Sequence, residues 1–104
     1  MLFRSGEGVP EDDAEAVKWY RKAADQGLTL AQFKLGGMYY NGEGVPENHV
    51  RAYAWWNLVS ASNSSWGTKA KAAKEVLASG MTPEQIAEAQ KLSTEYFAKI
   101  QANQ

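Results

Sequence analysis

A hexapeptide that occurs twice is the feature that most constrains the fold of this chain. The string GEGVPE spans residues 6–11 and again residues 42–47, an offset of 36 residues. Two further pairs keep the same offset, Ala16 with Ala52 and Trp19 with Trp55. A period between about 20 and 50 residues is typical of stacked supersecondary units. The repeat therefore predicts an array of similar units in place of a fold with a single, unrepeated core.

A third unit is present in a degenerate form. Gly80 falls 36 residues after Gly44, and Pro83-Glu84 follows with one extra residue inserted. Terminal units of an array are commonly atypical, because one of their faces must meet water. We expect one domain over 1–104, divided into a partial first repeat (1–27), a second repeat (28–63) and a degenerate capping unit (64–104).

Hydrophobic periodicity and capping residues predict five helices. The expected spans are 12–26, 30–40, 48–61, 66–78 and a last helix from Pro83 to about residue 100. Their expected N-caps are Asp12, Thr29, Asn48 and Thr82, with Ser64-Ser65 in the turn before the fourth helix. No segment alternates convincingly at a period of two residues, so the predicted class is all-α.

Two features of these helices bear on packing. In the first helix, Ala16, Trp19 and Tyr20 belong to an apolar stripe with helical spacing, which we expect to face inward. In the second helix, Gly36 is unfavourable by roughly 1 kcal/mol relative to Ala. We interpret this glycine as the place where a neighbouring helix approaches closely.

Two strings of this pattern resemble the signature of the Sel-one-like repeat (SLR) family, a relative of the tetratricopeptide repeat. They are Ala16-x-x-Trp19-Tyr20-x-Lys22-Ala23-Ala24-x-x-Gly27-x-x-x-Ala31 and Leu35-Gly36-x-x-Tyr39-x-x-Gly42-x-Gly44-Val45. The matching signature positions are Gly6, Gly8, Ala16, Trp19, Tyr20, Leu35, Gly36, Tyr39, Gly42, Gly44, Ala52 and Trp55. The sequence departs from the pattern at Trp56, at Val59-Ser60 and at Asn63.

The resemblance carries expectations about fold and function. It implies a right-handed α-α superhelix, or solenoid, of helix–turn–helix repeats of about 36 residues, closed by a degenerate C-terminal pair of capping helices. The last segment resembles the ending of many bacterial members. Members of the family act as adaptors and scaffolds that bind another protein or peptide on the concave surface, so we expect no enzyme and no cofactor.

Composition limits the classes of partner. Eleven basic and 12 acidic residues give a net charge of −1, which provides no field to attract nucleic acid or anionic lipid. There is no cysteine, and no run approaches the roughly 20 apolar residues of a membrane span. No signal peptide is visible, so the sequence as given predicts a cytoplasmic protein, or a periplasmic one if it was cut from a longer secreted chain.

Candidate chemical groups have simple structural explanations. The repeated pairs Trp19-Tyr20 and Trp55-Trp56 could form a ligand cage, but core packing explains their recurrence better. The Gly-Glu-Gly loops lack the Lys and Ser/Thr of a phosphate-binding P-loop. His49, the one histidine, cannot build a zinc site alone and is expected in solvent. Other polar groups are assigned to helix capping (Glu11, Asp12, Asp13, Glu15) or to one solvated helix face (Lys69, Lys71, Lys74).

One stripe on the second helix has two interpretations. Phe33, Gly37 and Tyr40 lie away from the Ala31–Leu35 face and either pack on the preceding hairpin or offer aromatic anchors to a peptide. Gln32 adjoins them in the candidate protein-binding surface. A separate hypothesis follows from the missing first helix of unit one, which would leave a side of helix 12–26 bare. A homodimer would cover that side.

Overall fold

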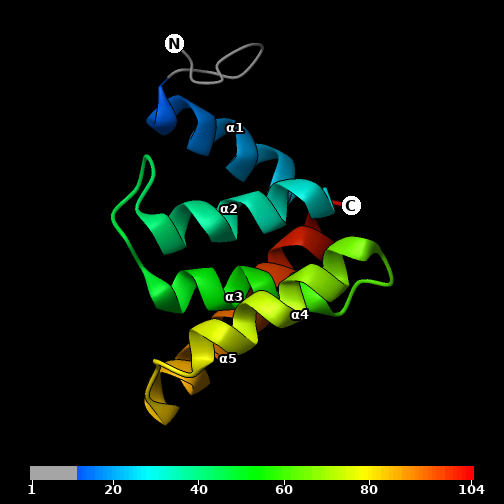
Figure 1. Cartoon of the computed structure of the whole chain (residues 1–104). Coiled ribbons are helices and arrows are strands. Elements are labelled where there is room, and N and C mark those ends of the chain that lie inside the picture. The colour runs from blue at the N-terminus through cyan, green and yellow to red at the C-terminus, as the bar shows by residue number, and fades with distance from the viewer. Residues whose placement is uncertain (1–11) are drawn as a thin grey trace.

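The computed structural model describes residues 12–104, which form five helices and no strand (Figure 1). The helices are α1 (Asp13–Asp25), α2 (Thr29–Asn41), α3 (His49–Ser60), α4 (Ser65–Ala78) and α5 (Pro83–Ala102). The predicted all-α class is confirmed. Gly6, Gly8 and Glu11 lie outside the described residues, so the structure gives no account of them.

The helix starts follow the expected caps in three cases out of four. The side-chain oxygens of Asp12, Asn48 and Thr82 each accept a backbone N–H from the first turn of their helix. The prediction for Thr29 is wrong, since Thr29 is itself the first helical residue. Leu28 stands at the cap position there and has no side-chain hydrogen bond to the helix. Local capping chemistry thus fixes most helix starts, while α2 depends on its packing.

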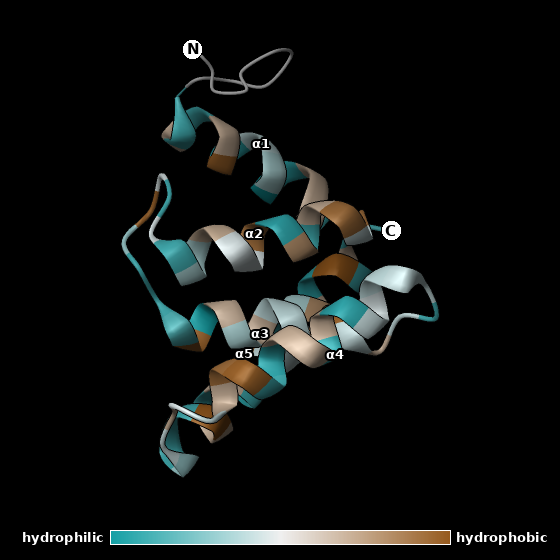
Figure 2. Cartoon of the chain, in the orientation of Figure 1, coloured by the Kyte–Doolittle hydropathy of each residue, from teal (hydrophilic) through white to brown (hydrophobic). Residues whose placement is uncertain are grey.

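Helix α3 is the centre of the packing. It contacts α2, α4 and α5, and six of its side chains are buried: Ala52, Tyr53, Ala54, Trp55, Trp56 and Val59. Figure 2 nevertheless shows much of α3 in pale colours, because Trp and Tyr combine large apolar rings with polar groups. A helix buried on several sides needs apolar residues around its circumference, and α3 has them.

The capping helices enclose α3 from two sides. Figure 1 shows α4 in front of α3 and α5 behind it. The two helices share little contact beyond the turn that joins them, whereas α4 also meets α2 and α5 also meets α1. The capping unit therefore differs from the α2–α3 hairpin, whose two helices pack closely on each other.

The expected inward orientation of Trp19 is wrong. Its side chain is 61% exposed, whereas its repeat equivalent Trp55 is only 1% exposed. The difference comes from α5, which places Tyr96 on Trp55 with ring centroids 4.1 Å apart. No helix of the described chain takes the corresponding place on α1, where Ala16 and Val17 are the buried residues of this turn.

The C-terminal end of α5 reaches back to the turn between α1 and α2. The Lys99 ammonium lies 3.4 Å from the Asp25 carboxylate, and Asn103 Nδ2 donates to the Asp25 carbonyl at 3.1 Å. Gln104 Nε2 donates to the Gln26 carbonyl at 3.2 Å. Each exposed contact is weak alone. Together they join the last unit of the chain to the first.

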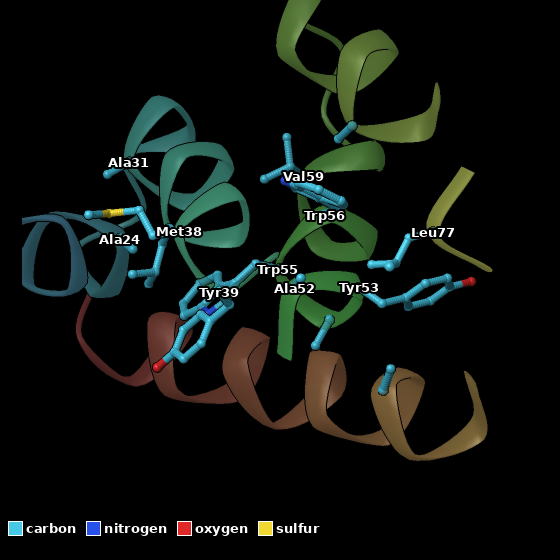
Figure 3. Packing of buried hydrophobic residues seen from close by; sticks show 14 of the residues in the cluster. Ala24, Ala31, Met38, Tyr39, Ala52, Tyr53, Trp55, Trp56, Val59 and Leu77 are labelled. Atoms are coloured by element: carbon cyan, nitrogen blue, oxygen red, sulfur yellow. The ribbon is translucent and has the colours of Figure 1, made fainter. Parts of the chain in front are cut away.

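The close approach expected at Gly36 is confirmed. A Cβ atom at this position would lie 2.5 Å from Nε1 of Trp56 and 2.6 Å from its Cδ1. Nε1 also donates to the Phe33 carbonyl at 3.2 Å, which holds the indole against α2. Figure 3 shows Trp56 among the buried side chains of α3. Only a glycine leaves room for this indole.

We expect opposite effects from alanine at two adjacent glycines. Gly36→Ala should lower the free energy of unfolding by about 1–3 kcal/mol, because the methyl group overpacks against Trp56. Gly37→Ala should raise it by up to about 1 kcal/mol, since nothing lies within 4 Å of its Cβ position and alanine favours a helix. Urea unfolding of both variants measures the difference. Equal stabilisation by the two substitutions would contradict the close approach.

Candidate functional site

A row of aromatic rings crosses α2, α3 and α4. This aromatic ladder consists of Trp66, Phe33, Trp56, Tyr40 and His49. Phe33 lies 5.2 Å from Trp66 and 6.2 Å from Trp56 between ring centroids. Tyr40 lies 5.7 Å from Trp56 and stacks on His49 at 5.3 Å. These separations fall in the range of favourable aromatic pairs, so the rings hold one another in place.

The aromatic ladder is buried at one of its rings and partly exposed to solvent at others. Trp56 is buried, Phe33 and Trp66 are half-buried, and Tyr40 is 39% exposed. Gly37 lies between Phe33 and Tyr40 on α2, and the space around its Cβ position is open. The result is a partly exposed aromatic strip with a side-chain-free position at its middle.

Two expectations about this surface need correction. Gln32 is buried, and its Nε2 donates to the Ala24 carbonyl at 3.1 Å, so it stabilises the join between α1 and α2 and is not part of the exposed strip. The Phe33 stripe was expected either to pack on the preceding hairpin or to face a ligand. The first alternative is wrong, because Phe33 packs on Trp56 and Trp66, which follow it in the chain, where α4 contacts α2. The second alternative stays a prediction.

The sequence pattern did not single out two members of the ladder. Trp66 lies outside the repeated positions, and its only signal was the placement of a large aromatic residue in the first turn of a helix. His49 was expected in solvent. It stacks on Tyr40, and its Nε2 lies 2.8 Å from Oε2 of Glu47. Its role here is in packing at one end of the ladder.

The three lysines of α4 do not form one solvated face. The Lys69 ammonium lies 4.7 Å above the Trp66 ring, where a cation–π contact is favourable. Lys74 Nζ donates to Asn57 Oδ1 at 2.7 Å, which ties α4 to α3. Lys71 is exposed. The ladder therefore has a positive charge beside its Trp66 end.

The hollows on the described part of the chain are small. A shallow hollow of about 280 Å³ lies between α2, α3 and α5, at the small end of ligand pockets. Its lining contains no ionisable side chain: Gly27, Thr29, Gln32, Leu58, Val59, Ala61, Ser62, Phe97 and Ile100. In residues 12–104, no three or more metal-binding side chains gather. No helix of this part is long and apolar enough to cross a membrane.

Comparisons with known proteins agree with this architecture. A family model described as Sel1 repeat matches residues 1–28 and 29–63. The crystal structure of c5321, a protective antigen present in uropathogenic Escherichia coli strains, displays an SLR fold and superposes with a TM-score of 0.81. It is 37% identical over 92% of this chain, which spans only 20% of that protein. No curated protein matches the chain.

Alanine substitutions should separate the anchoring rings of the ladder from the exposed ones. Phe33→Ala should lower the free energy of unfolding by about 2–3 kcal/mol, because it removes a ring packed between two tryptophans. Tyr40→Ala should lower it by less than about 1 kcal/mol, since the ring is exposed on one side. Urea unfolding checks both values. A larger loss from Tyr40→Ala than from Phe33→Ala would contradict this division.

Proposed function

Because the chain belongs to the Sel1 repeat family, we propose that it is a protein-binding module that holds a partner on the aromatic ladder. Helical-repeat arrays commonly use their extended surfaces to bind other proteins. The fold shared with c5321 supports a role of this general kind. The surface that we assign to this role, the aromatic ladder, is formed by residues of this chain.

Tyr40 is the observation that carries the proposal. Tyr40 is 39% exposed, yet its ring stacks on His49 at 5.3 Å and packs against Trp56 at 5.7 Å. A ring fixed in this way loses little side-chain entropy on binding. Aromatic residues are also enriched among those that dominate binding energy. An exposed and preorganised ring is therefore a suitable anchor for a partner.

The neighbouring groups indicate the kind of partner. Gly37 leaves space beside Tyr40 for an apolar side chain to reach the α2 backbone. Lys69 supplies positive charge at one end of the ladder, and Glu47 supplies negative charge at the other. A peptide or helix with a central apolar residue and opposite charges at its ends fits this strip.

Surface variants test the proposal. We expect Tyr40→Ala and Gly37→Glu to lose a protein that the unmodified chain captures from its native host, as identified by mass spectrometry. With the captured protein purified, each variant should raise Kd at least about tenfold, which corresponds to 1.4 kcal/mol.

Lys71→Ala is the matched control, because Lys71 is exposed on α4 outside the ladder. Unfolding curves of all three variants confirm that they are folded. Unchanged Kd values for both ladder variants would remove this surface from consideration.

Self-association is a second candidate function, and Trp19 favours it. This ring is 61% exposed on α1 and touches Tyr20 edge to face at 5.4 Å. A twofold contact through α1 would bury it in both copies. Sedimentation at rising concentration should show a dimer, and Trp19→Ser should return the chain to a monomer. An unmodified chain that stays monomeric at high concentration would refute this.

A further inference from the structure

Three buried polar atoms in the described part of the chain have no hydrogen-bond partner. They are Nε of Arg21, Nε1 of Trp55 and the hydroxyl of Tyr96. Each can donate a proton, and leaving such a donor unsatisfied in a protein interior is unfavourable. Most buried polar groups are satisfied. Three unsatisfied donors on three different helices therefore need an explanation.

The three donors belong to one cluster. Tyr96 stacks on Trp55 at 4.1 Å, and the Arg21 guanidinium donates to the Tyr39 hydroxyl. The guanidinium carbons of Arg21 and Arg51 lie 6.0 and 5.7 Å from the centre of the Tyr39 ring. These five residues, Arg21, Tyr39, Arg51, Trp55 and Tyr96, form the arginine–tyrosine cluster. Figure 3 shows Tyr39 and Trp55 extending from α2 and α3 toward α5.

Within the part of the chain that the structure describes, the arginine–tyrosine cluster carries two positive charges and no carboxylate pairs with them. Among residues 12–104, the ion pairs join Glu47 to His49 and Asp25 to Lys99, and neither involves Arg21 or Arg51. Two guanidinium groups beside the same phenol ring repel each other where the surroundings screen them poorly. An acidic group bound at the exposed Arg51 would reduce this repulsion by supplying a negative charge beside the guanidinium groups.

One member of the cluster reaches the surface, while its unsatisfied donors are buried. Arg51 is exposed, while Arg21 is half-buried. Burial raises the pKa of Tyr96, against an opposing effect from the positive charge of Arg51. The hydroxyl therefore keeps its proton at neutral pH and can donate it. An acceptor that binds at the exposed Arg51 would meet the charged donors of its guanidinium, beside the buried donors of the same cluster.

We propose that the arginine–tyrosine cluster binds a carboxylate on an acidic peptide segment of a partner protein. This inference rests on the proposed protein-binding function and adds a second contact, on the α5 side of α3. Guanidinium groups match the planar carboxylate with paired N–H donors, and the flanking aromatic rings suit a peptide. The start of α3, which could hold a phosphate, is already capped by Asn48. With a net charge of −1, the chain has no extended positive field for the phosphate backbone of a nucleic acid.

A hexaglutamate peptide tests the inference directly on the full chain. Hexaglutamine is the uncharged control, and inorganic phosphate is the third ligand. Nuclear magnetic resonance should show hexaglutamate shifting the Nε–H signal of Arg21 and the indole N–H signal of Trp55, with weaker binding at high salt. Hexaglutamine should shift neither signal. Hexaglutamate that leaves both signals in place would overturn the inference, and phosphate that binds as tightly would overturn the peptide assignment.

Charge-matched variants distinguish binding at this cluster from non-specific electrostatic attraction between hexaglutamate and the protein surface. Arg51→Gln should weaken hexaglutamate binding at least about tenfold, whereas Lys71→Gln, which removes the same charge from an exposed site on α4, should leave it unchanged. Arg51→Lys should fall between them, since it keeps the charge but loses the paired donors. Equal weakening by Arg51→Gln and Lys71→Gln would overturn the inference. Arg51 is exposed, and unfolding curves verify that its variants fold.

Failure of the proposed protein-binding function can be distinguished from failure of the carboxylate site. Tyr40→Ala and Gly37→Glu should leave hexaglutamate binding unchanged, because the aromatic ladder lies on the α4 side of α3. If these variants also keep every captured partner while Arg51→Gln loses hexaglutamate, the proposed ladder function fails and the carboxylate site stands. If the ladder variants lose the partner and hexaglutamate does not bind the unmodified chain, the carboxylate site fails and the proposed ladder function stands.

Discussion

The contact between Trp56 and Gly36 is the constraint on which the rest of the structure depends. It brings α2 and α3 so close that a single methyl group would not fit between them. The indole N–H bonded to the Phe33 carbonyl fixes the orientation of the ring. With α2 and α3 joined in this way, one side of α3 is left for α4 and the other for α5. Both proposed binding regions follow from this division, because the aromatic ladder forms on the α4 side and the arginine–tyrosine cluster on the α5 side.

Local chemistry in the sequence predicted the helices well. The caps at Asp12, Asn48 and Thr82 depend on a side chain and the backbone of the next turn, so they can be read without knowledge of the fold. The role of Gly36 was also readable, because a glycine inside a helix has few explanations other than close approach. The cap predictions share the property that the relevant atoms are near one another in the chain, whereas the prediction for Gly36 rests on the cost of a glycine within its own helix.

Predictions that depended on which helix covers which face did less well. Trp19 was expected to be buried because Trp55 occupies the same place in the repeat, but Tyr96 covers only Trp55. Gln32 was assigned to a surface although its amide found a backbone acceptor at the end of α1. Trp66 and His49 were not predicted as members of the ladder for the same reason, because the rings that they contact, Phe33 and Tyr40, lie on another helix. A periodic pattern describes one helix, and the partner helix decides which of its faces is buried.

The return of α5 to the turn between α1 and α2 has a consequence for how the molecule loses structure. In an array whose units touch only their immediate neighbours, either end can fray while the middle stays intact. Here the end of α5 is bonded to Asp25 and Gln26 through Lys99, Asn103 and Gln104. The two hydrogen bonds among these contacts each join residues 78 positions apart in the sequence. The outermost helices therefore share a boundary, and loosening one removes contacts from the other. The two ends of the stack are therefore not independent: loss of structure at either end also removes contacts that stabilise the other.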